Sequence, residues 1–312
     1  MSAAAQQAPM QFSPTSSQLA MAYSVCRGIT RAAAKNFYYG FLVLPRKKQE
    51  ALCAVYAFMR KCDDIADDAN LSVRDRRERL TTWLDAFHRA QAGFPTDDPV
   101  LLALTDAQRR YSIQTDLLDQ LAFGTAMDVL ELDEPGFARD VPVIHYATFN
   151  DLSQYCYRVA SVVGLVCIRI FGYRDRSAEP LAEKTGLAFQ LTNIIRDVKE
   201  DALMGRVYLP EEDMQEFGVY PADCRTPSDP ARMRALLAKE AGRAREFYAA
   251  GETLIPLVDE DSQPALWVLT TIYRRLLERI AARQYDVFAE RIRLSVFEKL
   301  TILAKGFLKR LS

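Results

Sequence analysis

Apolar residues recur at three- to four-residue spacing along most of the chain, which is the pattern of helices that bury one face. It predicts helices over residues 17–34, 45–68, 73–92, 101–111, 113–130, 149–171, 180–200, 229–249 and 263–288. The breaks coincide with Gly- and Pro-containing stretches such as 93–95, 133–136 and 219–230. The strand-like run 141–144 is isolated. The fold class predicted from this pattern is all-α.

The chain has no interior linker that is long or biased enough to separate domains. Its longest break spans residues 217–230 and carries its own turn residues. We therefore expect one all-α domain over residues 17–312. Residues 1–16 lack the cationic and apolar regions of a signal peptide and are expected to form a disordered lead-in.

The most apolar stretch, 159–173, contains Arg169 and follows Arg158. A membrane span needs about 20 nearly uncharged residues, so a buried helix is the preferred interpretation. The run 305–312 is basic and could touch anionic lipid, but a solvated helix end is preferred there. Peripheral contact with a membrane is left open, and no transmembrane segment is expected.

Composition removes several classes of function. Lys plus Arg (40) nearly equals Asp plus Glu (41), so no strong basic field indicates a nucleic-acid partner. The six cysteines form no C-x-x-C pair and only two histidines are present, which argues against a zinc site and against a disulfide framework. A cytoplasmic location is expected. Neither a G-x-G-x-x-G nor a Walker-type loop is found, which argues against those nucleotide sites.

A first acidic motif, 60–68, closes one predicted helix. Asp63 and Asp67 are four residues apart and share a helix face, where their like charges repel unless a cation is present. Asp64 and Asp68 form a second such pair. An acidic, solvated helix end is the plain alternative.

A second acidic motif lies within an apolar helix. Asn193, Asp197 and Asp201 follow each other at four-residue spacing, and Gln190 joins the same face. Their neighbours, such as Ile194 and Ile195, are strongly apolar, and buried polar groups are costly unless they are satisfied. This stripe is therefore unlike an ordinary surface pattern.

Two carboxylate stripes suggest a specific chemistry. Mg²⁺ takes one or two protein carboxylates and completes its octahedron with water and substrate phosphate. Two acidic walls could hold several Mg²⁺ ions between them, and these would draw charge from a diphosphate leaving group. Arg60, Arg196 and Arg206 are candidates for phosphate contacts. Aromatic side chains near both motifs could line a hydrocarbon chain; the candidates are Phe37, Tyr38, Phe41, Tyr56, Phe58 and Phe189.

At this point the residues resemble a known family. The stretches 36–45 and 54–67 resemble the first signature of squalene and phytoene synthases. The run 155–164 is similar to their central motif, and 186–210 is similar to their second signature. The resemblance covers roughly residues 20–300, with the motifs in order.

The resemblance implies the isoprenoid-synthase helical fold with a central cavity, an enzyme that transfers prenyl groups, and two prenyl diphosphates as partners. It implies that Mg²⁺ and diphosphate are carried by Asp63, Asp67, Asn193, Asp197 and Asp201. Tyr155 would lie near the reacting carbons. The substrate-binding positions that it implies are Tyr56, Arg60, Gln190, Asn193, Arg196, Arg206, Tyr208, Tyr273 and Arg291.

The implied reaction is a head-to-head condensation with a cyclopropyl intermediate. The string 155–160, continuing to 168–172, looks most like bacterial presqualene diphosphate synthases of hopanoid pathways, so two farnesyl diphosphates are the expected substrates. NADPH would be needed only if the reaction continued to squalene. The alternative within the family is a phytoene synthase using two geranylgeranyl diphosphates. Outside this family, the alternative functions are a terpene cyclase and a non-catalytic helical scaffold. The oligomeric state is not readable.

Overall fold

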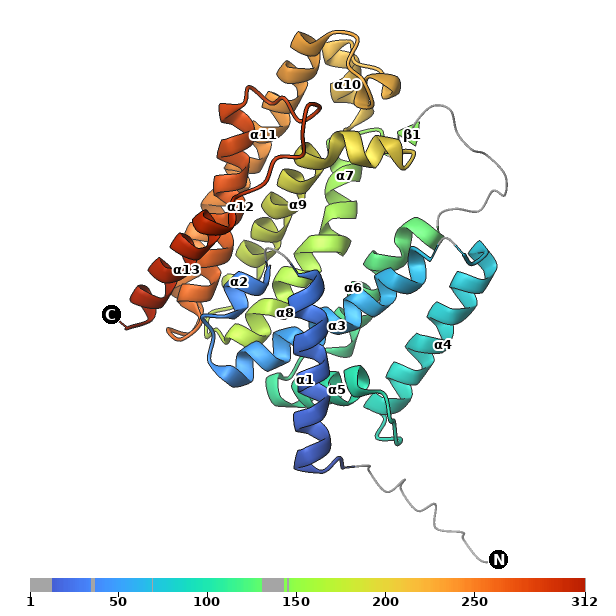
Figure 1. Cartoon of the computed structure of the whole chain (residues 1–312), viewed down its shortest axis with the longest axis vertical. Helices are drawn as coiled ribbons and strands as arrows, with labels where there is room; N and C mark the ends of the chain where they lie inside the picture. Colours follow the sequence, from blue (N-terminus) through green and yellow to red (C-terminus); the bar gives the residue numbers. More distant parts are fainter. Residues whose placement is uncertain (1–12, 35–36, 69, 131–142, 145, 312) are drawn as a thin grey trace, which may run out of the picture. The chain divides into compact units, whose positions relative to one another are not determined.

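The computed structural model describes residues 13–34, 37–68, 70–130, 143–144 and 146–311 (Figure 1). Helices dominate this part of the chain, which confirms the all-α class. The helices are α1 (Ser16–Ala33), α2 (Phe37–Phe41), α3 (Arg46–Ala66), α4 (Val73–Gln91), α5 (Pro99–Tyr111), α6 (Thr115–Leu130), α7 (Phe149–Cys156), α8 (Val162–Phe171), α9 (Ala178–Leu203), α10 (Glu211–Phe217), α11 (Pro230–Leu254), α12 (Gln263–Ala282) and α13 (Val296–Leu311).

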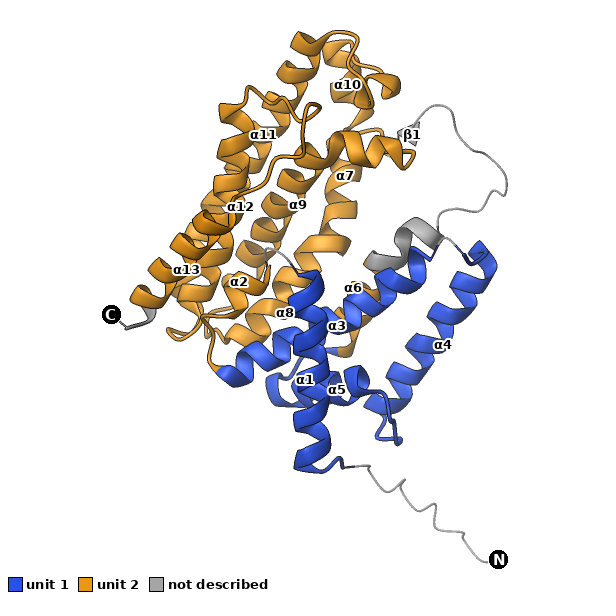
Figure 2. Ribbon diagram, viewed as in Figure 1, with its two compact units in different colours: residues 1–35, 46–114, 125–133 blue, residues 36–45, 115–124, 134–312 orange. Residues whose placement is uncertain are grey.

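The chain forms two compact units (Figure 2). Unit 1 contains residues 1–35, 46–114 and 125–133, and unit 2 contains residues 36–45, 115–124 and 134–312. The single-domain expectation for 17–312 stays a prediction. The expected disordered lead-in falls mostly on residues outside the described ranges; within them, Thr15 caps α1 through a capping box with Gln18.

In unit 1, α1, α3 and α5 pack against one another, and α4 packs against α3 and α5. Phe58 of α3 is fully buried, 4.9 Å from Phe87 and 6.0 Å from Trp83 between ring centroids. Phe58 is therefore part of the core of this unit. Its candidacy as a lining residue for a hydrocarbon chain stays a prediction.

In unit 2, α9 packs against α8, α11 and α12. The approach is close enough that a Cβ at Gly186 would lie 2.5 Å from the Ala160 carbonyl oxygen, and one at Gly164 would lie 2.7 Å from the Ala182 carbonyl oxygen. Larger residues at these two positions would push the helices apart. These two glycines therefore set how deeply α9 is buried.

A small parallel ladder lies beside α9. Strand β1 (Val143–Ile144) pairs with β2 (Arg206–Val207), with Val143 opposite Arg206. The isolated strand-like run at 141–144 thus has a partner in the residues that follow the second acidic motif. Residues 141–142 lie outside the described ranges.

Two predicted helices differ from the structure. The predicted helix 149–171 is interrupted by a π-helical segment, Tyr157–Ser161, between α7 and α8. The predicted helix 263–288 ends at Ala282, because Gln284 and Tyr285 adopt positive φ values of 54° and 60° that a right-handed helix cannot continue. The short helices α2 and α10, and α13, were not predicted.

Within the described residues, one helical stretch, Phe149–Phe171, is long and apolar enough to cross a membrane by length and composition alone. Half of its most apolar window is buried inside the protein. Buried residues of α8 such as Val166 and Ile170 are completely shielded from solvent. A core helix satisfies the same criterion, so this stretch is weak evidence for a membrane span.

Candidate functional site: two carboxylate clusters

The first acidic motif forms the end of α3 in unit 1. The helix ends at Ala66, but the Asp67 N–H still donates to the Asp63 carbonyl at 2.8 Å, so the two aspartates lie one turn apart as predicted. Asp63 is half-buried, whereas Asp67 is exposed. We call Tyr56, Arg60, Asp63 and Asp67 the α3 cluster.

Two further side chains of the α3 cluster lie on the preceding turns. Arg60 forms an ion pair with Asp64 at 2.6 Å, which is an i, i+4 contact on the helix surface. Burial raises the pKa of Tyr56; the positive charge of Arg60 opposes that shift and the carboxylates of Asp63 and Asp64 reinforce it. The tyrosine, the arginine and the carboxylates therefore share one electrostatic environment.

The second acidic motif lies near the end of α9 in unit 2. Leu191, Ile194 and Ile195 are buried, while Asn193, Asp197 and Asp201 are only partly exposed. Asn193 Nδ2 donates to Gln190 Oε1 at 3.5 Å, so these two amides share a face as the spacing predicted. The α9 cluster is made of Gln190, Asn193, Arg196, Asp197, Asp201 and Arg291.

Asp197 is held by two guanidinium groups. Arg291 donates from Nε to Oδ1 at 2.8 Å and from Nη2 to Oδ2 at 2.9 Å, and Arg196 donates to both oxygens as well. Burial tends to raise the pKa of Asp197, but the hydrogen bonds from Arg196 and Arg291 outweigh burial and lower it. Arg291 lies 94 residues further along the chain than Asp197, so the motif is completed by a remote segment.

The pKa of Asp201, one turn further along α9, is shifted in the opposite direction. Burial, and then the charge of Asp197, raise the pKa of Asp201 to about 7, with Arg206 acting in the other direction. One oxygen of the adjacent Glu200 is also buried without a hydrogen-bond partner. This end of α9 therefore carries carboxylate charge that the surrounding side chains do not fully neutralise.

Tyr155 and Tyr208, both predicted to be site residues, lie in an aromatic group with Tyr146. The ring centroids of Tyr155 and Tyr208 are 5.2 Å apart, and Tyr146 lies 5.3 Å from Tyr155 and 6.2 Å from Tyr208. Tyr208 directly follows β2, and Tyr146 follows β1, so the two-stranded ladder brings these rings together. Sequence reasoning missed Tyr146, which carries no motif of its own.

Tyr155 is also close to irregular backbone. The π-helical segment begins two residues after it, at Tyr157. Single-turn π segments inside α-helices occur frequently at functional sites because they redirect side chains. This observation supports the predicted importance of the 155–164 motif.

Tyr273 of α12 lies face to face with Phe189 of α9, with centroids 4.3 Å apart and planes inclined by 7°. Phe37 of α2 packs on the same tyrosine at 5.6 Å. Phe189 thus joins the helix of the acidic motif to α12. All three rings belong to unit 2.

Lys199 lies within the second signature but was not among the predicted site residues, and it links α9 to the segment that carries Arg291. Lys199 Nζ donates to the Phe288 carbonyl at 2.7 Å, in the segment between α12 and α13 that carries Arg291. The contact spans 89 residues of sequence and therefore could not be read from local spacing.

The predicted site residues thus form two groups, one in each unit. Tyr56, Arg60, Asp63 and Asp67 lie together at the end of α3. The remaining residues belong to unit 2, where Arg196, Asp197 and Arg291 are in direct contact. Within the described residues, no group of three or more His, Cys, Asp or Glu side chains is arranged to hold a metal ion.

Comparisons with known proteins agree with this reading. A family model described as squalene/phytoene synthase matches residues 30–298. A phytoene synthase from Mycobacterium tuberculosis is 39% identical over 291 residues, which cover 92% of this chain and 91% of that protein. A 15-cis-phytoene synthase from Synechococcus elongatus is 32% identical, over 97% of this chain and 98% of the relative.

Solved structures show the same fold. A dehydrosqualene synthase solved with a ligand has a TM-score of 0.80 and 30% identity, over 93% of this chain and 96% of that one. A squalene synthase from Alicyclobacillus acidocaldarius has a TM-score of 0.75 and 27% identity, over 87% of this chain and 97% of that one. With its helices, its acidic motifs and these matches, the chain belongs to the squalene/phytoene synthase family, whose members condense prenyl diphosphates head to head.

Proposed function

We propose that this chain condenses two molecules of geranylgeranyl diphosphate head to head and forms phytoene through prephytoene diphosphate. The observation that carries the choice of substrate is the 39% identity, over nearly the whole length of both chains, to a protein named phytoene synthase. The similarity to the dehydrosqualene and squalene synthase structures is lower, at 30% and 27%. This proposal replaces the expected farnesyl substrate and hopanoid pathway with the alternative within the family, a phytoene synthase that uses geranylgeranyl diphosphate.

The donor set fits Mg²⁺. Asp63 and Asp67 present hard oxygen ligands one turn apart, and Asn193, Asp197 and Asp201 present them along α9. The raised pKa of Asp201 and the unpartnered Glu200 oxygen indicate charge that a cation would neutralise. Few protein ligands are needed, because Mg²⁺ usually retains waters and substrate phosphates. When bound, Mg²⁺ would draw negative charge from the diphosphate leaving group.

The chain's own residues would then position the substrates. Arg196 and Arg291 carry planar guanidinium groups suited to diphosphate oxygens, and their shared contact with Asp197 orients both before substrate binds. Arg60 and Tyr56 would serve the same purpose at the α3 cluster. Gln190, Arg206 and Tyr273 are proposed as further substrate contacts.

The aromatic group supplies the other requirement of the reaction. An allylic carbocation needs surroundings that stabilise positive charge without attacking it, and aromatic faces do this. Tyr155 and Tyr208 are buried and stacked, so their rings are fixed by packing. We assign these two rings, with Tyr146, to the stabilisation of the cationic carbon skeleton.

The proposed sequence balances without a reductant. The first prenyl diphosphate loses diphosphate, and the C2–C3 double bond of the second attacks its C1 carbon. Loss of a proton closes the cyclopropane of prephytoene diphosphate. A second loss of diphosphate, a rearrangement and a second proton loss give phytoene, so no hydride from NADPH enters.

Product analysis tests this proposal. The purified protein is incubated with Mg²⁺ and either geranylgeranyl or farnesyl diphosphate, with and without NADPH. Phytoene formed from the longer substrate, independently of NADPH, is the expected result. Presqualene diphosphate or squalene formed preferentially from the shorter substrate would overturn the choice of substrate, and no product from either would favour a non-catalytic scaffold.

Two expectations are carried forward as part of the proposal. None of the six cysteines, all of which lie in the described residues, forms a disulfide, which fits a reducing compartment, and we retain the cytoplasm as the proposed location. The substrates of this chain are proposed to be small prenyl diphosphates rather than nucleic acid.

A further inference from the structure

A buried network of charged side chains joins α10 to α11 in unit 2. Arg243 of α11 donates from Nη2 to Asp213 Oδ1 at 3.1 Å, and its Nη1 contacts the second oxygen of Asp213. The same Nη1 donates to Glu240 Oε1 at 2.7 Å. Both carboxylate side chains are only 1% exposed. We call Asp213, Glu240 and Arg243 the α10–α11 network.

Stability alone does not account for the burial of this network. Two carboxylates and a guanidinium lose their water shells, and the ion pairs return only part of that desolvation energy. Apolar residues of similar volume often stabilise a protein as well or better. What a guanidinium adds is direction, because it donates two parallel hydrogen bonds to a carboxylate in one plane. The contact of Arg243 with Asp213 therefore fixes the orientation of α10 on α11.

Helix α10 in turn holds the segment that carries Tyr146. The Glu211 N–H donates to the Tyr146 carbonyl at 3.0 Å. The Glu212 N–H donates to the Ala147 carbonyl at 3.0 Å, and the Glu212 side chain accepts from the Phe149 N–H at 2.7 Å. Tyr146 and Ala147 lie between β1 and α7, outside any helix or strand, so no repeating hydrogen-bond pattern fixes their positions. The contacts with α10 therefore help to determine where the Tyr146 ring lies.

The α10–α11 network also contacts α7, the helix that carries Tyr155. The Arg243 guanidinium lies 4.3 Å from the centroid of the Phe149 ring, at the first residue of α7. At the last residue of that helix, burial raises the pKa of the Cys156 thiol and the charge of Glu240 adds to the shift. The charge of Glu240 therefore reaches the end of α7 beside Tyr155. The network acts on both the segment of Tyr146 and the helix of Tyr155.

We propose that Arg243 is a positioning residue, which acts through Asp213 and α10 to hold Tyr146 in the aromatic group with Tyr155 and Tyr208. This inference rests on the proposed function for its purpose, because that function assigns the three rings to the cationic carbon skeleton. The packing of the rings does not depend on the substrate. It can therefore be measured in the ligand-free protein.

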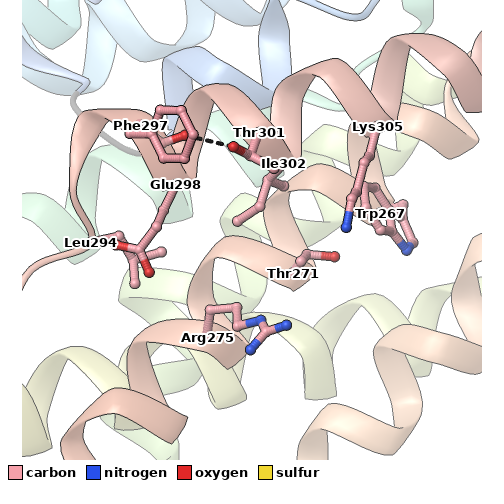
Figure 3. Close-up of a pocket in the computed structure, with 9 residues that line it drawn as sticks. All are labelled: Trp267, Thr271, Arg275, Leu294, Phe297, Glu298, Thr301, Ile302 and Lys305. Carbon is pink, nitrogen blue, oxygen red and sulfur yellow. Dashed lines mark hydrogen bonds between the residues drawn. The ribbon is translucent and has the colours of Figure 1, made fainter.

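Arg275 of α12 supplies a matched control. Like Arg243, it pairs with a glutamate three positions away on its own helix, here Glu278 at 3.6 Å. The Arg275 side chain is 67% exposed, compared with 21% for Arg243. It lines a surface groove between α12 and α13 together with Trp267 and Lys305 (Figure 3). Exposed pairs of this kind contribute little, so Arg275→Lys should leave the aromatic group unchanged.

The first experiment is fluorine NMR of the ligand-free, full-length chain with fluorotyrosine at its 14 tyrosine positions. The resonances of Tyr146, Tyr155 and Tyr208 are assigned by replacing each of them with Phe in turn. Arg243→Lys keeps the charge but cannot form the forked contact with Asp213, so we expect the three resonances to shift or broaden.

A second variant and an internal reference complete this experiment. Asp213→Asn keeps the side-chain volume but retains only one acceptor oxygen, so it should shift the same three resonances less. Arg275→Lys should shift none of them. The resonance of Tyr23 on α1 should stay constant in every variant, and thermal melting checks that each one is folded.

A double-mutant cycle connects the position of Tyr146 to the reaction. Arg243→Lys should lower kcat about tenfold with KM nearly unchanged, because the ring acts on the cation and not on substrate binding. In the Tyr146→Leu background, Arg243→Lys should lower kcat less than about twofold further. The cycle uses whichever prenyl diphosphate the wild type turns over.

Unchanged resonances of all three tyrosines in folded Arg243→Lys and Asp213→Asn would overturn the proposal. An equal shift of the Tyr23 resonance would also overturn it, because the network would then support the fold in general. So would equal kcat losses with and without Tyr146, since Arg243 would act independently of that ring. Shifted resonances in a chain that turns over neither prenyl diphosphate would support the positioning and contradict the proposed function.

Discussion

The α3 and α9 clusters hold similar residues in different surroundings. In the α3 cluster the aspartates lie at the end of a helix, Asp67 is exposed, and Arg60 is paired with the neighbouring Asp64. In the α9 cluster Asp197 is only 15% exposed and is held by two arginines. A buried helix requires its polar groups to be satisfied within the protein, whereas a helix end can leave them to solvent.

Under the proposed function, this difference predicts two kinds of diphosphate site. The arginines of the α9 cluster are oriented before any ligand binds, so this cluster resembles a preformed anion site. In the α3 cluster Arg60 is paired with Asp64, and under the proposed function the carboxylates of this cluster would hold Mg²⁺. Both kinds are needed if each of the two substrates must lose its diphosphate.

The largest expected effect is the loss of a proposed metal ligand. Asp63→Asn and Asp197→Asn should each lower the turnover number by about 100- to 1000-fold, as removal of one charge-stabilising group does in other enzymes. Release of inorganic diphosphate from geranylgeranyl diphosphate measures it. Asp68→Asn is the control, because Asp68 accepts hydrogen bonds from Asn70 that an asparagine side chain can also accept.

If only one of these two variants lost activity, the two clusters would not both belong to the site. If Asp63→Asn remained fully active, the α3 cluster would be a solvated helix end rather than part of the site. If Asp197→Asn remained fully active, the contacts of Arg196 and Arg291 with Asp197 would be structural ion pairs.

The next effect concerns the contact of Arg291 with Asp197. Arg291→Lys keeps the charge but cannot form two parallel hydrogen bonds with Asp197, so we expect KM to rise about tenfold. Arg283→Lys, in the same segment and paired with Glu290 on the surface, is the matched control and should change KM less than about twofold. Initial-rate kinetics at saturating Mg²⁺ measure both. Equal values for the two variants would mean that the forked contact has no function.

Lys199 should show a smaller effect of a different kind. Lys199→Met removes the contact with the Phe288 carbonyl and loosens the segment that carries Arg291, so KM should rise about threefold with kcat nearly unchanged. Lys184→Met, at an exposed position of the same helix, is the control. A fall in kcat with constant KM would assign Lys199 to the chemical step instead of to positioning.

The last prediction concerns stability and pH rather than kinetics. The folded-state pKa of Asp201, about 7, lies above the unfolded value of about 4, so ionising this carboxyl in the ligand-free protein lowers stability between these pH values. Asp201→Asn should therefore melt above wild type at pH 8, and the difference should disappear as the pH falls toward 4. Thermal unfolding with a chelator present measures it. A difference that is the same at both pH values would contradict the assignment.

The sequence predicted the parts of the site that depend on local spacing. Asp63 with Asp67, and Gln190 with Asn193, share a helix face because the α-helix repeats every 3.6 residues. The family resemblance pointed to Arg291, but its double contact with Asp197 depends on the path of the segment after α12. That path follows from the positive φ values at Gln284 and Tyr285. Neither residue is a glycine, so the sequence has no signal for a turn at this point.

Other features were beyond a linear reading for similar reasons. Tyr146 reaches Tyr208 because β1 pairs with β2, which is a contact between segments about 60 residues apart. Lys199 donates to a backbone carbonyl, which leaves no pattern of residue types. Helix α13 was not predicted; its apolar residues lie on both sides, with Phe297 exposed and Ile302 buried, and such a pattern shows no single apolar face.

Ligand-induced thermal stabilisation tests most directly whether both clusters bind one substrate type. The wild-type chain is melted with Mg²⁺ and an unreactive geranylgeranyl diphosphate analogue at about 100 times its Kd, which should add about 2.7 kcal/mol to the free energy of unfolding. We predict a clear rise in Tm for wild type and for Asp68→Asn, and a much smaller one for Asp63→Asn and for Asp197→Asn. A wild-type Tm that does not respond, or a full response in both aspartate variants, would contradict the account.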